Sequence, residues 1–99
     1  MQIKHDAQIK KLCEVIAGLK TPEDAALVLE DLCTIQEISA LSQRLQVASL
    51  LHGGMNYTEI NSTTGVSTAT ISRVNRCLNY GSGGYKIALE IMKEDSNDN

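Results

Sequence analysis

The chain has 99 residues, a single proline and a formal net charge of −3. A chain of this length has room for one compact domain with a small core, and such chains often dimerise. No apolar run reaches the roughly 18 residues that cross a bilayer, and the start lacks a secretory signal, so we expect a soluble, cytoplasmic protein without membrane contact.

The apolar content is 42%, with three tyrosines and neither Phe nor Trp. The interior must therefore be built from aliphatic side chains, a mixture that favours helices packed on helices. Three cysteines stand far apart with no CxxC spacing, so we expect reduced thiols in the core rather than metal ligands. Nothing along the chain alternates as a strand does, and the expected fold class is all-α.

Two helices are predicted in the first third of the chain. The first covers about residues 3–18, where apolar side chains recur every three to four residues. Thr21 and Pro22 suit the N-cap and first position of a second helix over about residues 22–32. The apolar stripe of the first helix consists of Ile9, Leu12, Ile16 and Leu19. The second helix should bury Ala26, Leu27, Leu29 and Leu32 or their neighbours.

Four more helices follow. Thr34 and Glu37 form a capping box that opens a long third helix, which Gly53 and Gly54 end. The remaining three are expected over about residues 57–63, 68–78 and 85–93. All six belong to one domain over residues 1–95, and we expect residues 96–99 to form a disordered acidic tail.

The segment around Gly65 has the spacing of a helix-turn-helix, over about residues 57–79. Ile60, Val66, Ile71 and Val74 fall where such a pair faces its core, and glycine tolerates the positive φ that a sharp turn requires. Small residues then lead the second helix and arginines follow, which suits an approach to base edges and phosphates. The predicted DNA-binding residues are Thr58, Ser67, Thr68, Ala69, Ser72, Arg73 and Arg76.

The net negative charge of the chain does not argue against DNA. Between Gln36 and Tyr80 the sequence contains two carboxylates and three guanidinium groups, which gives a local net charge of +1. This surplus is weak, and it keeps open an alternative in which the same helices form a protein-interaction or assembly module that does not bind DNA. An enzyme has no support, because the chain has no paired carboxylates, no nucleophile with a base and no cofactor loop.

The stretch "LSQRLQVASLLHGGMNYTEINSTTGVSTATISRVNRCL" resembles the Trp repressor family, and specifically its Trp-repressor-like YerC/YecD branch. The matches are "LSQR", "LLHGGM" and "TATISR". The resemblance implies a bacterial transcription regulator with six helices per chain, an intertwined homodimer whose recognition helices enter successive major grooves of a palindromic operator on double-stranded DNA. From the residues themselves we expect no metal and no cofactor, because the chain has neither metal-ligand spacing nor a cofactor loop.

The resemblance also implies a possible effector site. In tryptophan-responsive members two arginines flank the corepressor, and the matching positions here are Arg44 and Arg73. Val74 stands where those members have a small residue that makes room for an indole ring, and the added side chain overpacks that space. We therefore expect that tryptophan is not the ligand, which leaves a different, unidentified small-molecule effector or none.

Overall fold

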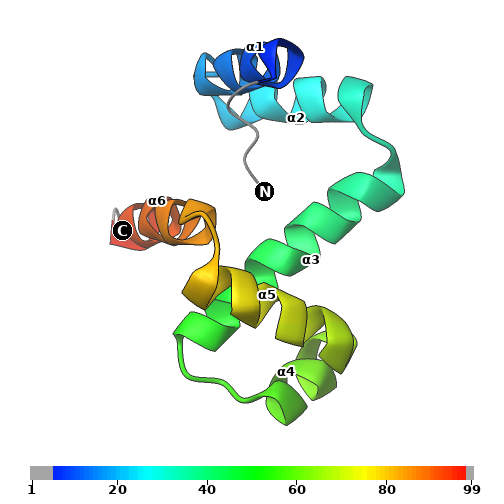
Figure 1. Cartoon of the computed structure of the whole chain (residues 1–99), viewed down its shortest axis with the longest axis vertical. Helices are drawn as coiled ribbons and strands as arrows, with labels where there is room; N and C mark the ends of the chain where they lie inside the picture. The colour runs from blue at the N-terminus through cyan, green and yellow to red at the C-terminus, as the bar shows by residue number, and fades with distance from the viewer. Residues whose placement is uncertain (1–5, 98–99) are drawn as a thin grey trace. The chain divides into compact units, whose positions relative to one another are not determined.

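The computed structural model describes residues 6–97, with side chains through Glu94. Over this range the chain forms helices and no strand, so the predicted all-α class is confirmed. The helices are α1 (Ala7–Ala17), α2 (Pro22–Leu32), α3 (Ile35–His52), α4 (Tyr57–Thr64), α5 (Thr68–Tyr80) and α6 (Gly84–Asn97), drawn in chain order from blue to red in Figure 1. They fall into two compact units, of which the first ends at Ile38 and the second begins at Ser39.

Side-chain caps set the helix starts in the first unit. The Asp6 carboxylate accepts hydrogen bonds from the amides of Gln8, at 2.8 Å, and Ile9, at 3.1 Å. Helix α1 therefore begins at Ala7, later than predicted, and the part of the prediction that concerns residues 3–5 lies outside the described residues. Thr21 caps α2 as predicted, because its hydroxyl accepts from the amide of Asp24 at 3.0 Å.

The first unit has no buried residue among those that the structure describes. The predicted burial of Ala26, Leu27 and Leu32 is therefore wrong for the chain by itself, and Leu27 is 62% exposed. On the predicted stripe of α1, Leu12 and Ile16 are exposed as well. Periodicity correctly groups these side chains on helix faces, but it does not reveal whether the same chain covers the face. Cys13 is also exposed, as is Cys77 on α5, so these two thiols are not in the core.

Helix α3 opens with the predicted capping box. The amide of Thr34 donates to the Glu37 carboxylate at 2.8 Å, and the amide of Glu37 donates to the Thr34 hydroxyl at 3.1 Å. Each side chain thus satisfies a backbone group that has no partner within the helix. The reciprocal pair fixes the start of α3 at Ile35.

The second unit has a small aliphatic core. Its buried members come from α3, α4, the turn after α4, and α5: Val47, Ala48, Ile60, Val66, Ile71 and Val74. The four helix-turn-helix residues predicted from spacing are all among them. Tyr57 of α4 and Tyr85 of α6 pack against this core, so three helices hold α5 in place.

Helix α6 is longer than predicted, because it begins at Gly84 and continues to Asn97. The predicted disordered tail thus overlaps the helix at Ser96 and Asn97, while residues 98–99 lie outside the described residues. The prediction that residues 1–95 form a single domain remains a prediction.

Candidate nucleic-acid interface

A left-handed glycine ends α4 and allows the chain to turn into α5. Gly65 has φ 76° and ψ 0°, and its amide donates to the carbonyl of Asn61 at 2.8 Å. A side chain in this backbone conformation costs roughly 1 to 2 kcal/mol. Two residues later Ser67 begins the next helix, so the predicted pivot is confirmed, and Figure 1 shows α4 and α5 running in different directions across this turn.

Ser67 caps the N-terminus of α5. Its hydroxyl oxygen accepts from the amide of Thr70 at 3.2 Å, and its carbonyl accepts from the amide of Ile71 at 3.0 Å. The amides of Thr68 and Ala69 precede the first bond of the helical ladder, so they point outward from the helix end. Outward amides at a helix N-terminus favour a negatively charged ligand such as a phosphate.

The predicted contact residues of α5 form one face. Ala69, Ser72, Arg73 and Arg76 follow the spacing i, i+3, i+4 and i+7, which aligns side chains along one side of a helix. Ser72 is half-buried, because it lies at the flank of the buried side next to Ile71, and the other three are exposed. We call these four residues the recognition face.

The remaining predicted contacts lie at helix starts. Ser67 and Thr68 are exposed at the beginning of α5, beside the recognition face in sequence. Thr58 is exposed in the first turn of α4, after the N-cap Asn56. A short basic helix thus presents small polar side chains at its leading end and guanidinium groups one and two turns later.

Among the described residues, the guanidinium groups of this region form no ion pair with a carboxylate of the same chain. The ion pair recorded among the described residues joins Lys11 and Glu14 on α1, at 3.5 Å. The carboxylate of Glu59 accepts from the amide of Asn56 at 3.2 Å in a capping box, which holds it at the start of α4. The guanidinium groups of Arg73 and Arg76 therefore remain available to an external anion.

Two side chains that the sequence did not single out also shape the turn. Asn61 donates from Nδ2 to the carbonyl of Val66 at 2.8 Å. The hydroxyl of Thr64 accepts from the amide of Val66 at 3.1 Å and donates to the carbonyl of Ile60 at 2.7 Å. The only sequence signal for this role is an Asn and a Thr shortly before a glycine, a composition that many turns share.

The two predicted effector residues lie on one small hollow. Arg44 of α3 and Arg73 of α5 line it together with Thr70, Val74, Cys77 and Tyr85, and its volume is about 120 Å³. The side chain of Val74 is 1% exposed and belongs to the core, as the spacing predicted. The hollow is well below the ~300 Å³ at which sites for drug-sized ligands usually begin.

Tyr85 brings a phenol to this hollow. Burial raises the pKa of Tyr85 above its ordinary value, and the nearby thiol of Cys77 acts in the same direction. The positive charges of Arg44 and Arg73 oppose the rise, since they favour the phenolate. The net upward direction means that the folded chain favours the neutral phenol over the phenolate.

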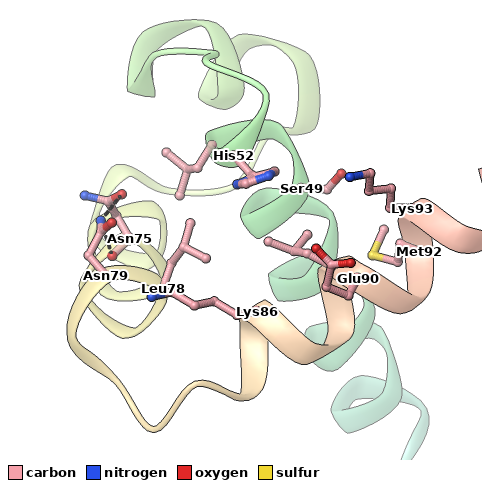
Figure 2. Close-up of a pocket in the computed structure, with 11 residues that line it drawn as sticks. Ser49, His52, Asn75, Leu78, Asn79, Lys86, Glu90, Met92 and Lys93 are labelled. Carbon is pink, nitrogen blue, oxygen red and sulfur yellow. Dashed lines mark hydrogen bonds between the residues drawn. The ribbon is translucent and has the colours of Figure 1, made fainter.

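A larger groove of about 710 Å³ lies elsewhere in the second unit (Figure 2). The ends of α3 and α5 line it together with α6, and Leu78, His52 and Lys86 are among its side chains. Figure 2 also shows Asn79 donating from Nδ2 to Asn75, at 2.9 Å to the carbonyl and 3.0 Å to Oδ1. The groove contains none of the predicted DNA contacts or effector residues.

The described part of the chain offers neither a metal site nor a membrane span. Over residues 6–97 no three His, Cys, Asp or Glu side chains are grouped so that they could hold a metal ion. Among the helices described, none combines the length and apolarity that a bilayer crossing requires.

The six helices and the glycine-hinged pair α4–α5 define an all-α protein of the helix-turn-helix class. The chain belongs to the Trp repressor family, because residues 7–93 match the family described as Trp repressor protein. Members of this family are regulators of transcription rather than enzymes, and DNA is the partner that the family indicates. The predicted family is thereby confirmed.

Relatives from three bacteria agree with this assignment. The chain is 49% identical over 87 residues to the uncharacterized protein YerC of Bacillus subtilis (strain 168), covering 88% of this chain and 84% of that one. A crystal structure from Staphylococcus aureus, provisionally named a Trp repressor, superposes with a TM-score of 0.85 at 42% identity over 94% of this chain and 95% of that one. A TrpR-like protein from Eubacterium eligens gives a TM-score of 0.82 at 46% identity over 91% and 94%.

Proposed function

We propose that the protein is a sequence-specific DNA-binding regulator that binds a palindromic operator as an intertwined homodimer through α4 and α5. The observation that carries the proposal is the recognition face on α5, which is exposed except for the half-buried Ser72, while Ile71 and Val74 of the same helix are buried. A helix held from behind in this way can enter the major groove without disturbing its own core.

Some of the DNA-binding residues position the helix on the DNA backbone, and others contact the bases. The outward amides of Thr68 and Ala69 and the guanidinium groups of Arg73 and Arg76 bind phosphates, which fixes the register of the helix on the duplex. The side chains of Thr68, Ala69 and Ser72 face base edges, where small groups allow close approach. The Thr58 hydroxyl adds a contact to the DNA backbone, and Ser67 lies beside the backbone as the cap of α5, where its hydroxyl donates to Thr70 Oγ1 at 3.1 Å.

The apolar faces left exposed by the chain support a homodimer. Six large aliphatic side chains in the first unit are more than two-fifths exposed: Leu12, Val15, Ile16, Leu27, Leu32 and Ile35. Ile87 and Ile91 of α6 are exposed as well, at 66% and 56%. Large contiguous apolar surfaces on a small protein mark contact sites for another chain, and a second copy would cover the same faces on both subunits.

Two-fold symmetry then relates the two recognition helices. We expect operator half-sites about 34 Å apart, one turn of the DNA helix, arranged as a palindrome. The protein acts in the cytoplasm, where it meets bacterial DNA.

Selection of duplexes from a random DNA pool tests the proposal. We expect enrichment of a palindrome, with an affinity that falls as salt rises because bound phosphates release counterions. Failure to enrich any sequence, even at low salt, would remove the proposal.

Arg73→Ala combined with Arg76→Ala tests the recognition face directly. We expect loss of operator retention in a gel-shift assay and a salt slope reduced by about 1 for each phosphate that is no longer bound. Lys10→Ala combined with Lys20→Ala is the matched control, because it removes the same charge from exposed positions outside α4 and α5. Equal weakening by both pairs would indicate a general charge effect instead.

The same Arg73 and Arg76 double variant distinguishes a DNA-binding regulator from the alternative, a protein-interaction module. A module that docks on another protein through the helix pair α4–α5, rather than on DNA, largely keeps that partner when both arginines are removed. A regulator of the proposed kind loses its DNA and remains a dimer.

The regulator does not respond to tryptophan. The hollow between Arg44 and Arg73 is about 120 Å³, and the buried side chain of Val74 forms part of its wall. We expect no heat of binding when tryptophan is titrated into the protein, and no change in operator affinity. An increase in operator affinity with tryptophan would contradict this part of the proposal.

A further inference from the structure

The turn between α4 and α5 contains one residue whose peptide groups are removed from water. Val66 is 6% exposed and lies between Gly65, which ends α4, and Ser67, which caps α5. Buried backbone amides and carbonyls need partners, because each unpaired group costs about 1 to 3 kcal/mol. Neither helix supplies those partners from its own ladder, since Val66 belongs to neither.

Two side chains of α4 supply them instead. The amide of Val66 donates to the Thr64 hydroxyl at 3.1 Å, and its carbonyl accepts from Asn61 Nδ2 at 2.8 Å. The Thr64 hydroxyl is itself oriented, because it donates to the carbonyl of Ile60 at 2.7 Å. The backbone of Asn61 is restrained as well, since its carbonyl accepts a hydrogen bond from the amide of Gly65 at 2.8 Å.

These bonds fix the direction in which the chain leaves α4. Gly65 allows the turn at φ 76° but does not by itself select one geometry, because a residue without a side chain can adopt many backbone conformations. The two side chains restrain the peptide groups on both sides of Val66, and the next residue is the cap of α5. A change of angle there moves Ala69, Ser72, Arg73 and Arg76 together relative to α4.

We propose that Asn61 and Thr64 are positioning residues for DNA recognition: they clamp the Val66 peptide groups and so set the angle of α5 relative to α4. The inference rests on the proposed DNA-binding function. Neither residue needs to touch DNA, and their effect is on sequence discrimination, because base contacts depend on helix position more than phosphate contacts do.

The experiment compares two clamp variants with two controls. Asn61→Ala removes the donor to the Val66 carbonyl, and the residue is exposed, so no cavity forms. Thr64→Val keeps the shape but removes the hydroxyl, and Thr64→Ser restores that hydroxyl. Asn79→Ala is the matched control, because Asn79 also donates from Nδ2 to a backbone carbonyl, at 2.9 Å, on α5 beyond the recognition face.

We expect Asn61→Ala and Thr64→Val to weaken binding to the selected operator about tenfold, a loss comparable to that from one mismatched base pair. Binding to a random duplex should change less than about twofold, because phosphate contacts carry it. Thr64→Ser and Asn79→Ala should behave as the unchanged protein does. Both clamp variants should also lower the melting temperature, because each leaves a Val66 peptide group unpaired. A merely structural role would instead weaken binding to both duplexes equally.

Hydrogen exchange of the Val66 amide in the DNA-free protein provides an independent readout. We expect it to exchange at least about tenfold faster in Thr64→Val than in Thr64→Ser, because the amide has lost its acceptor. Unchanged exchange, or an unchanged ratio of operator to random affinity in both clamp variants, overturns the inference while the proposed function stands. Absence of any selected operator for the unchanged protein would remove the proposed function, even if the exchange result shows the clamp.

Discussion

The two units of the chain use the same local signals but differ in what they bury. In the first unit Asp6, Thr21 and the pair Thr34–Glu37 cap helices through side-chain hydrogen bonds, yet no described residue is buried. In the second unit similar caps begin α4 and α5, and six aliphatic residues form a core. Caps therefore set where helices begin, whereas burial decides which helices a single chain can hold together.

The difference also separates two tasks. The second unit can position a recognition helix with its own residues, because Ile60, Ile71 and Val74 hold α4 and α5 together. The first unit leaves its aliphatic faces uncovered, which suits contacts with another chain. In the proposed homodimer, therefore, one unit reads DNA and the other contributes chiefly to association.

Ile71→Ala gives the largest expected effect on the second unit. Ile71 is 0% exposed, and truncating a buried isoleucine costs about 2 to 5 kcal/mol because a cavity remains. Urea unfolding, monitored by circular dichroism, measures this loss in free energy of unfolding. Ile16→Ala on α1 is the matched control, and at protein concentrations low enough to favour the monomer its cost should stay within about 0.5 kcal/mol. Equal costs at low concentration would mean that α1 buries Ile16 in the monomer as fully as α5 buries Ile71.

Leu27→Asp tests the first unit as an association surface. A charge on this exposed apolar side chain must be desolvated when another subunit covers it, so dimerisation should weaken at least about tenfold, or about 1.4 kcal/mol. Sedimentation equilibrium measures the change. Lys20→Asp places a charge at a position that is already polar and should leave the dimer intact. An unchanged dissociation constant for Leu27→Asp would show that α2 is not part of the interface.

Gly65→Ala tests whether the turn in the second unit requires a glycine at a positive φ. The added Cβ meets no atom within 4 Å, so the expected cost of about 1 to 2 kcal/mol comes from the positive φ alone. Gly84→Ala is the control, because a Cβ there also meets open space and its φ is not in the left-handed region. Urea unfolding of both variants should show a loss for Gly65→Ala only. A similar loss in both would attribute the effect to glycine in general rather than to the turn.

Most of the fold could be predicted from the sequence because its signals are local. Thr21, Thr34, Glu37 and Ser67 cap helices where expected, and Gly65 has the positive φ that the turn needed. The start of α1 was missed although Asp6 is a good N-cap residue, because the apolar periodicity suggested an earlier start.

Burial was predictable only where one chain covers its own face. The spacing around Gly65 identified Ile60, Val66, Ile71 and Val74, since a tight turn forces the two helices together. The spacing on α1 and α2 gave the apolar faces but not their exposure, because periodicity is the same whether the chain itself or another molecule covers a face.

The candidate site follows the same division. The i, i+3, i+4, i+7 spacing from Ala69 to Arg76 defines the recognition face once α5 is a helix. Asn61 and Thr64 were missed, because their role depends on where the Val66 peptide groups point after the turn has formed. Tyr85 was missed at the hollow because it comes from another helix, and no local pattern relates it to Arg44 and Arg73.

The smallest expected effect concerns Tyr85 and makes the stability of the second unit depend on pH. Burial, the largest cause, raises the pKa of Tyr85 in the folded chain above its value of about 10 in the unfolded chain. The unfolded chain therefore releases this proton first as pH rises, so the contribution of Tyr85 to stability is complete below about pH 10 and is lost as pH rises through the folded pKa. We expect urea unfolding free energies to fall as pH rises past about 10, and to fall less in Tyr85→Phe, which has no phenol to ionise. Tyr80→Phe is the matched control, because Tyr80 is 86% exposed, and it should leave the decline unchanged. An equal decline in both variants would mean that ionisation of the half-buried Tyr85, beside Arg44 and Arg73, does not make the packing of α6 on α5 depend on pH.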